Sequence, residues 1–419
     1  MINKSPIALA ALLFAVGTTS LSLIPAQALA ETAPAATAKQ ESVRAEMGKP
    51  FAEIQTFINS KDYSQALAKI DALEAMEKKT PYEVFAIART RAVVASGSGN
   101  NDALAKAFDV MINSDFLPAA DKVKYAEGMA GTFYNEKKYD QSKQWILRAL
   151  SLNKDSVAMH DLLARTMYLQ NDFNGAIAEI NQQLEADAQA KRVPSHERLH
   201  LLISCHLKLK DTAGYIATLE RMVEFYPKKE YWGDLLYRLP NKTGFSDRLR
   251  LDWYRLMLAT ENMEEGAQYV EMTELALLAG LPLEAKKIMD AGYAANMLGT
   301  GKDVAKHKQL RDKANKQAAD DLKSMEAGEA AAKAAKNGIG MVNMGYNYVI
   351  NEQTEKGIAL MEQGIAKGGL KAAEEAKLHL GMAYLQAGNK TKAAEIFKTI
   401  QGNDGTADLA KLWLLVRKD

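Results

Sequence analysis

Apolar residues recur at spacings of three and four along most of the chain, in paired segments separated by short polar turns. The clearest pair is 376–400, AKLHLGMAYLQAGNKTKAAEIFKTI. Its first segment carries Leu380, Gly381 and Tyr384 along one side, a turn follows at 387–389, and its second segment carries Ala393 and Phe397. This pattern predicts two antiparallel amphipathic helices, which approach closely where one side chain is small and a large neighbour fills the space.

The position of Ala393 has counterparts far along the chain. We identify them at Ala66, Leu104, Ser142, Ala176, Tyr215, Leu249, Ala285 and Gly357, with a further one near Leu322. Neighbouring members of this series are 34 to 39 residues apart. A repeat of that length is typical of helical solenoids, in which each unit is a helical hairpin that packs on its neighbours.

The order of residues in 376–400 resembles the tetratricopeptide repeat (TPR), a helical hairpin of about 34 residues. Leu380-Gly381 is followed three residues later by Tyr384, then by a glycine turn, Ala393 and Phe397. The resemblance implies an all-α fold, a right-handed α-α superhelix of antiparallel hairpins, and protein or peptide binding rather than catalysis. Composition agrees with a globular helical chain, since 47% of residues are hydrophobic, 25% are charged and only 10 are proline.

The first thirty residues do not fit the repeat pattern. Lys4 precedes an apolar run over 7–16, and Ala28-Leu29-Ala30 forms a small-residue cleavage site, so we predict a signal peptide over 1–30 that is cleaved near Ala30. The apolar run is shorter than the ~20 residues that span a bilayer. With Cys205 as the only cysteine, no internal disulfide can form, and together with the TPR resemblance this favours the bacterial periplasm.

The remaining chain divides into four predicted parts. Residues 31–49 are interpreted as a flexible linker, 50–298 as TPR-like repeats, 299–338 as one long charged Ala/Lys-rich helix, and 339–419 as C-terminal repeats with a capping helix at 407–416. The long helix has a thin apolar stripe from Val304 to Met325. It is expected either to brace the solenoid or to form a coiled-coil seam with a partner.

The segment His196-Glu197-Arg198-Leu199-His200 matches H-E-x-x-H, which supplies two zinc ligands and a general base in zincin peptidases. On an unbroken helix His206 would lie roughly 15 Å from His196 along the axis, so it cannot complete the site. Arg198 also places a cation beside the expected dication. We therefore predict no catalytic residue, no cofactor and no metal, and we keep a role of the histidine pair in metal binding as an alternative.

The TPR resemblance implies a concave groove lined by the first helix of each hairpin. Carried onto the best-matched units, it selects Lys124, Glu127, Tyr134, Asp161, Arg165, Tyr168, Glu197, His200 and Ser204 as a peptide-binding groove. Tyrosines offer rigid contact area and arginine offers a fork for a carboxylate. The alternative is that these side chains are ordinary solvated partners of their own helices.

These observations lead to one main hypothesis, an exported, non-catalytic scaffold or adaptor that binds proteins or peptides of the bacterial cell envelope. A self-associating structural protein and a zinc-dependent hydrolase are the alternatives. Without Lys4 the chain has 52 basic against 52 acidic residues, so its charge favours neither nucleic acid nor an anionic membrane. The partner and the oligomeric state do not follow from the sequence.

Overall fold

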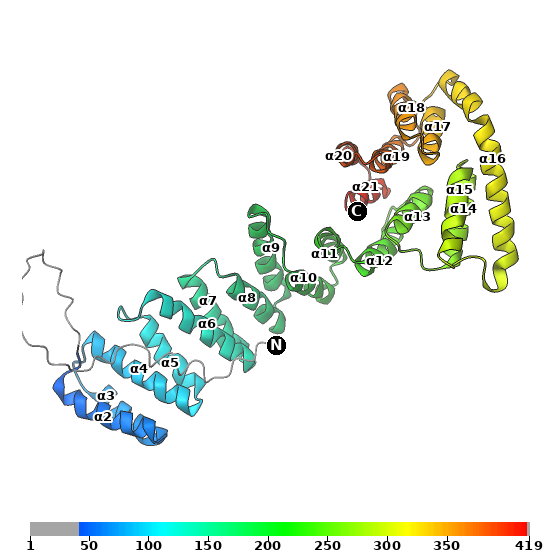
Figure 1. The fold of residues 1–419 in the computed structure, drawn as a ribbon. Coiled ribbons are helices and arrows are strands. Elements are labelled where there is room, and N and C mark those ends of the chain that lie inside the picture. Colours follow the sequence, from blue (N-terminus) through cyan, green and yellow to red (C-terminus); the bar gives the residue numbers. More distant parts are fainter. Residues whose placement is uncertain (1–41, 417–419) are drawn as a thin grey trace, which may run out of the picture. The chain divides into compact units, whose positions relative to one another are not determined.

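The computed structural model describes residues 42–416, and no strand occurs among them (Figure 1). The predicted all-α fold of antiparallel helical hairpins is confirmed. The chain forms two compact units, of which the first ends at Arg192 and the second begins at Val193. The predicted signal peptide lies outside the described residues. Within residues 42–416, no helix has both the length and the apolar character needed to cross a membrane.

The first unit consists of consecutive hairpins. Their helices are α2 (Ala45–Asn59) with α3 (Tyr63–Ala75), α4 (Pro81–Ser98) with α5 (Asn101–Ile112), α6 (Ala119–Asn135) with α7 (Tyr139–Leu152), and α8 (Val157–Leu169) with α9 (Phe173–Gln189). Large side chains such as Phe108, Phe133 and Ile146 are completely buried between them. The core therefore runs along the hairpins, and most charged residues lie outside it, apart from the buried Glu83 and Asp187.

The tight turns inside the hairpins follow from the local sequence. At 61–62 and 171–172, a residue with positive φ ends the first helix, and the next residue, Asp62 or Asp172, caps the second helix with its carboxylate. The backbone N–H of Asp62 also donates a hydrogen bond to the carbonyl of Phe57, which satisfies an acceptor at the end of the first helix. Each turn thus ends one helix and starts the next with only three residues between them.

The structure differs from the predicted linker at the start of the first unit. Helix α2 begins at Ala45 and contains Pro50 in its interior, although 31–49 had been assigned to a linker. Met47 is fully buried, and the backbone N–H of Arg44 donates to Glu83 Oε1 at 3.0 Å while its guanidinium donates to Oε2 at 2.7 Å. These contacts extend the helix upstream of the proline, which the local composition does not reveal.

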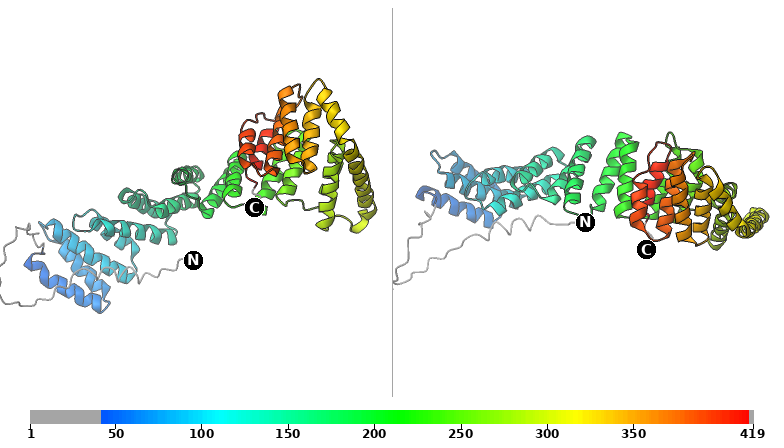
Figure 2. Two further views of the ribbon diagram at one scale, coloured as in Figure 1. Left: turned by 45° about the horizontal axis from the view of Figure 1, so that its top comes forward. Right: turned by 90° about the horizontal axis from the view of Figure 1, so that it is seen from above.

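The second unit contains further hairpins and two single helices. Its helices are α10 (His196–Leu209), α11 (Thr212–Phe225), α12 (Lys229–Arg238), α13 (Arg250–Ala259), α14 (Gly266–Leu278), α15 (Pro282–Ala294), α16 (Val304–Ala334), α17 (Ile339–Ile350), α18 (Thr354–Lys367), α19 (Ala373–Gln386), α20 (Lys390–Phe397) and α21 (Thr406–Trp413), with 3-10 turns η1 (Leu239–Asn241), η2 (Asp247–Leu249) and η3 (Gly301–Asp303). The helices of this unit lie side by side in the views of Figure 2.

The predicted repeat register agrees with the hairpins at most positions. Ala66, Ser142, Ala176, Ala285 and Ala393 are all fully buried near the start of the second helix of a pair. The counterpart near Leu322 is wrong, because that residue lies in the middle of α16 and is 51% exposed. There the apolar spacing belongs to one uninterrupted helix rather than to a hairpin.

Helix α16 is the long charged helix predicted from the sequence. It packs along α15 and α17 and buries only small or flexible side chains, namely Ala314, Ala318, Met325 and Ala332. Within the described chain it lies against its own unit, as expected for a brace. Its outward face keeps Val304 and Leu322 partly exposed.

The last helix covers more than the final hairpin. Helix α21 packs on α19 and α20, as expected of a capping helix, but also on α13, which lies far upstream in the sequence. The backbone N–H of Ser246 donates to the carbonyl of Asp404 at 2.8 Å, and Lys242 contacts Asp408 at 2.8 Å. The second unit therefore closes on itself, and the helices α13, α14, α17 and α19 surround a common interior.

Candidate functional site

The predicted groove residues of the first unit lie on α6 and α8. Burial raises the pKa of the Tyr134 phenol and the positive charge of Arg165 opposes that rise, so the two helices bring these side chains close together. Arg165 is exposed and has no ion-pair partner among the described residues. Lys124 is also exposed on α6. This part of the predicted groove therefore presents an exposed arginine near the ring of Tyr134 and, farther along α6, an exposed lysine.

The other groove residues of the first unit are more engaged. Glu127 accepts a hydrogen bond from Ser156 at 3.0 Å. Tyr168 packs edge to face on Phe173 with ring centroids 5.4 Å apart, and Tyr134 packs in the same way on Tyr139. Asp161 is half-buried on α8. The two tyrosines therefore help to hold their own hairpins together while one edge of each stays accessible.

Glu197, His200 and Ser204 lie on α10 and so belong to the second unit. The rings of His196 and His200 share a face of α10, with centroids 4.3 Å apart. Both Nε2 atoms contact the hydroxyl of Tyr231, at 2.8 and 3.0 Å. The histidine pair is therefore engaged with a tyrosine of α12, and the nine predicted residues are divided between two separate units.

The geometry around α10 does not favour a zinc-dependent hydrolase. His206 is buried and its Nδ1 contacts Asp211 Oδ2 at 2.8 Å, so it lies on a different side of the helix from the pair. Burial and the neighbouring His196 lower the pKa of His200. Among residues 42–416, the one set of three or more His, Cys, Asp or Glu side chains spaced for a metal lies elsewhere, on α13 and α19.

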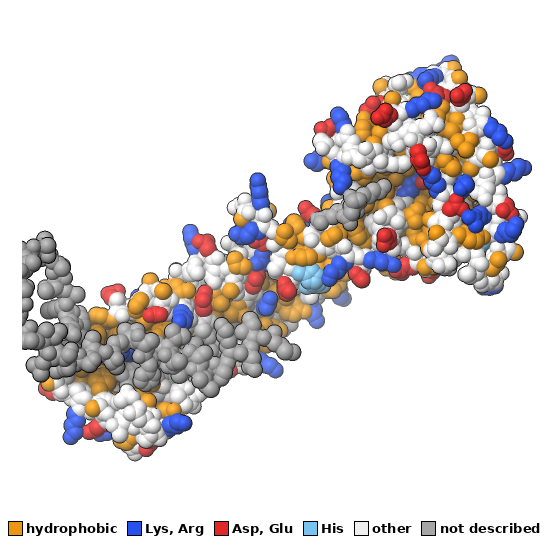
Figure 3. Space-filling view, in the orientation of Figure 1, with side chains coloured by type: hydrophobic (Ala, Val, Ile, Leu, Met, Phe, Trp, Pro, Cys, Tyr) orange, Lys and Arg blue, Asp and Glu red, His pale blue; other side chains and the backbone are white. Residues whose placement is uncertain are grey.

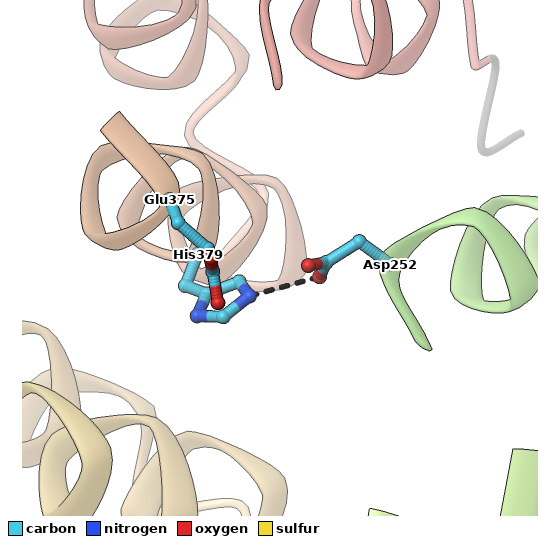
Figure 4. A group of neighbouring side chains, drawn as sticks. All are labelled: Asp252, Glu375 and His379. Atoms are coloured by element: carbon cyan, nitrogen blue, oxygen red, sulfur yellow. Dashed lines mark hydrogen bonds and ion pairs between the residues drawn. The ribbon is translucent and has the colours of Figure 1, made fainter. Parts of the chain in front are cut away.

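That set belongs to a network that we call the polar centre: Asp252, Arg255, Glu284, Tyr346, Glu375 and His379. Arg255 is 5% exposed and forms two hydrogen bonds with Glu284, at 2.7 and 2.6 Å, and one with Asp252 at 2.6 Å. His379 donates from Nε2 to Asp252 Oδ1 at 2.8 Å. Figure 4 shows Asp252 reaching from α13 toward His379 and Glu375 on α19.

The ring of Tyr346 packs against two members of the polar centre. It stacks on His379 with centroids 5.0 Å apart, and the Arg255 guanidinium lies 4.9 Å from its centroid. Both contacts restrict the ring, because an aromatic neighbour and a cation pack on it. Helix α17 thereby fixes a tyrosine against side chains from α13 and α19.

Charge is nearly balanced inside the network but not at its edge. Burial disfavours ionisation of Asp252, yet His379 and Arg255 beside it hold the pKa of this carboxyl below its usual range. Glu375 makes no hydrogen bond within the described chain, and burial raises its pKa. Its nearest cation is Arg248, with N and O atoms 4.0 Å apart, and Arg248 also pairs with Asp404 at 3.0 Å.

A divalent metal fits this site poorly. The ligand atoms of Asp252, Glu375 and His379 lie within 4.8 Å of one another. However, the guanidinium of Arg255 is already 2.6 Å from Asp252. A dication about 5 Å from that guanidinium would be repelled by roughly 7 kcal/mol at an effective dielectric constant of about 20. We therefore interpret the polar centre as a preformed hydrogen-bonding site for an organic group.

Sequence reasoning missed this site for a clear reason. Asp252 and His379 are far apart along the chain and meet only in the folded second unit, in which α21 packs on both α13 and α19. The local signals were present, since Asp252 and Arg255 are one turn apart on α13 and Glu375 and His379 one turn apart on α19. Nothing in either helix indicates that it faces the other.

Comparison with known proteins gives one match to a family. Residues 375–404, which include α19 and α20, match the profile of the tetratricopeptide repeat. None of the curated proteins matches the chain in sequence. The segment that the profile identifies is nearly the same hairpin whose spacing resembles a TPR in the sequence.

Several solved structures are similar to the chain at low identity. They include the TPR2AB domain of yeast Sti1 in a complex with an HSP90 peptide (12% identity, 71% of this chain and 99% of that one, TM-score 0.26). Another is the C-terminal part of a TPR repeat-containing protein of Cytophaga hutchinsonii (14%, 78% and 98%, 0.27). A third is yeast Tom70 (12%, 87% and 94%, 0.21). These TM-scores are too low for any of them to serve as a template for either unit.

Two observations therefore agree, the profile match over 375–404 and the antiparallel hairpins with small buried residues at the repeat positions. Residues 375–404 therefore match a tetratricopeptide repeat, and this repeat lies within an all-α array of helical hairpins.

Proposed function

We propose that the protein is an exported, non-catalytic scaffold or adaptor that binds proteins or peptides of the bacterial cell envelope. Arg165 carries this proposal: it is exposed, it has no ion-pair partner among the described residues, and it lies beside Tyr134. Arginine and tyrosine are the residue types that most often dominate protein interfaces. Charged side chains of both signs are scattered over the face of each unit seen in Figure 3.

A recovery experiment tests this binding surface. The full-length protein is crosslinked in cells, purified from the envelope fraction, and its partners are identified by mass spectrometry. We expect Arg165→Glu with Tyr168→Ala to abolish recovery of the partner while helical content stays unchanged. Loss of the Tyr168–Phe173 contact should lower the melting temperature slightly, and Arg165→Glu alone should leave it unchanged. Lys106→Glu makes the same charge reversal at an exposed position of α5 and should have no effect. Undiminished recovery by the double variant would show that the binding surface lies elsewhere.

Export is the second part of the proposal. It rests on Lys4, the apolar run and the Ala28-Leu29-Ala30 segment described above. Sequencing the N-terminus of the protein from fractionated bacterial cells should give a chain that begins near Glu31, recovered from the periplasmic fraction. A full-length chain in the cytoplasmic fraction would refute export.

The proposal that the protein is not an enzyme is tested through the histidine pair. We expect less than one zinc ion per ten chains in protein purified without chelators, and His196→Ala with His200→Ala should leave that value unchanged. About one zinc per chain, lost in the double variant, together with peptidase activity that Glu197→Gln removes, would establish the hydrolase instead.

A further inference from the structure

Next to the polar centre the second unit contains a cavity of about 420 Å³. This volume lies within the range of about 300–1,000 Å³ that is common for sites of small organic groups. Its polar lining, called the polar wall below, comes from α13, α17 and α19. Its apolar lining, called the apolar wall, comes from Leu251 of α13 and from leucines and an alanine at the end of α14 and the start of the following loop. The cavity thus offers both hydrogen-bonding groups and apolar surface.

The polar wall holds groups whose hydrogen-bonding capacity is unused. Tyr346 is 7% exposed and lines the cavity, but its hydroxyl has no hydrogen-bond partner among residues 42–416. Its ring contacts both His379 and Arg255. Asn343, one turn earlier on α17, and Glu375 on α19 also line the cavity without any hydrogen bond within the described chain. These three side chains therefore offer hydrogen-bonding groups to a molecule that enters the cavity.

The sign of the charge indicates what that group is. The cavity lining contains the carboxylates of Asp247, Asp252 and Glu375, the guanidinium groups of Arg248 and Arg255, and the imidazole of His379. Arg255 and His379 are hydrogen-bonded to buried carboxylates, and Arg248 is paired with Asp404. The charged lining groups left without a hydrogen bond, Asp247 and Glu375, are both carboxylates, which favours a cation. Glu375, the Tyr346 hydroxyl and the Asn343 carbonyl can each accept one of the three hydrogens of a primary ammonium.

The apolar wall indicates that the cation is attached to an alkyl chain. Leu278 is 85% exposed, the highest exposure among the large hydrophobic residues of the described chain, and it lines this cavity together with Leu275 and Leu281. Hydrophobic side chains are also visible over the surface of the second unit in Figure 3. A flexible methylene chain that ends in an ammonium group would cover the leucines and place its charge at the polar wall.

We propose that this cavity binds a lysine side chain from a segment of the partner protein. The inference rests on the proposed function, because a scaffold needs a protein partner, and it adds the chemistry that the partner must offer. Leu278 and its neighbours contact the methylene groups, Glu375 pairs with the ammonium, and the Tyr346 hydroxyl and the Asn343 amide accept its remaining hydrogens. The site is separate from the Arg165 surface, which suits negatively charged groups.

Binding to the full chain is tested with defined probes. The main probe is a capped heptapeptide with one lysine between two leucines. Matched peptides replace the lysine by Nε-acetyl-lysine or by norleucine, and n-butylamine represents a free alkylammonium. We expect the lysine peptide to give saturation-transfer NMR signals and a measurable Kd, the two matched peptides to bind at least about tenfold more weakly, and n-butylamine to bind more weakly than the lysine peptide.

Three variants assign the binding to the cavity. Tyr346→Phe removes only the hydroxyl and should raise the Kd about threefold. Glu375→Gln removes the carboxylate charge and should raise the Kd at least about tenfold. Neither change should lower the melting temperature. Glu355→Gln makes the same charge change at an exposed position of α18 and should leave the Kd unchanged.

Several results would overturn the proposal. Equal binding of the lysine and norleucine peptides would exclude recognition of the ammonium, and an unchanged Kd in both cavity variants would place the site elsewhere. Equal affinity of n-butylamine and the peptide would make a free amine, not a protein segment, the ligand. Loss of partner recovery through Arg165 is measured separately, so failure of the cavity proposal and failure of the scaffold proposal can be told apart.

Discussion

The contact between Gly381 and Phe397 gives the sharpest test of the hairpin packing. A Cβ atom at Gly381 would lie 2.3 Å from Phe397 Cε1 and 2.6 Å from its Cδ1, and Phe397 is only 3% exposed. The ring therefore has no free space into which to move. Overpacking of this kind costs about 1 to 3 kcal/mol, so Gly381→Ala should destabilise the second unit although alanine favours helices.

A double-mutant cycle isolates that clash. Phe397→Leu removes the ring edge and should itself cost about 1 to 2 kcal/mol through lost packing. In the double variant the added methyl group enters the space left by the ring, so the total cost should be below the sum by about 1 kcal/mol or more. Gly131→Ala is the matched control, since a Cβ there has no neighbour within 4 Å, and it should stabilise the first unit slightly.

Urea denaturation measures these free energies. Trp145 is the only tryptophan before Val193, so tryptophan fluorescence in a Trp145→Phe background reports on the second unit alone. Circular dichroism of the intact chain reports on both units. Additive costs in the cycle, or a neutral Gly381→Ala, would refute the close approach of α19 and α20 on which the repeat assignment depends.

Further predictions concern α21, an acidic cap and the polar centre. Truncation after Gly402 removes Trp413 and two buried leucines of α21, and burial of each side chain contributes roughly 1.5 to 3 kcal/mol. The melting temperature should therefore fall sharply, or the chain should aggregate. A stable, monomeric truncated protein would contradict the closed second unit. The hydrogen bonds from Arg44 and from the Thr80 N–H lower the pKa of Glu83 to about 2. In the unfolded chain the pKa of a glutamate is about 4, so the ionised Glu83 stabilises the first unit at pH values above about 4. This contribution is lost as the pH falls from about 4 through about 2. Thermal melting of the wild-type protein and Glu83→Gln at pH 6 and pH 2.5 should therefore show a smaller acid-induced change in the variant, and equal changes would show that the pair is not formed. Glu284→Gln, which weakens a buried ion pair, should cost about 3 kcal/mol in urea denaturation, whereas Glu264→Gln in an exposed pair should cost less than about 1 kcal/mol; equal costs would contradict the burial of the polar centre.

Local patterns were sufficient to predict the hairpins. The small residues Ala66, Ala176 and Ala393 are buried where two helices pack together. Their regular spacing in the sequence is kept even where the large side chains differ between repeats. Burial of Cys205 could also be predicted, since the thiol lies in an apolar helix, and burial raises its pKa to about 11. Such features depend only on neighbours within one hairpin. Because the hairpin geometry is the same in each repeat, the local sequence is enough to predict them.

Long-range closure could not be predicted in this way. The contact between Asp252 and His379 depends on how far the array turns between α13 and α19, and small angles at each helix interface add up over that distance. The sequence pattern specifies which residues are buried but not those angles. For the same reason the Tyr346 cavity was missed, while the groove residues assigned by family resemblance were divided between two units.

Closure of the second unit by α21 also determines how this part of the chain can fold. In an open array each repeat contacts only its neighbours, so the ends can unravel while the middle stays folded. Here residues 404–413 pack against 242–257, so opening either end removes contacts from the other. We therefore expect the helices between these segments to unfold together in one cooperative transition. We also expect slow folding, because the contacts that complete the unit join segments far apart in the sequence. During synthesis the second unit therefore cannot complete its fold until α21 has left the ribosome.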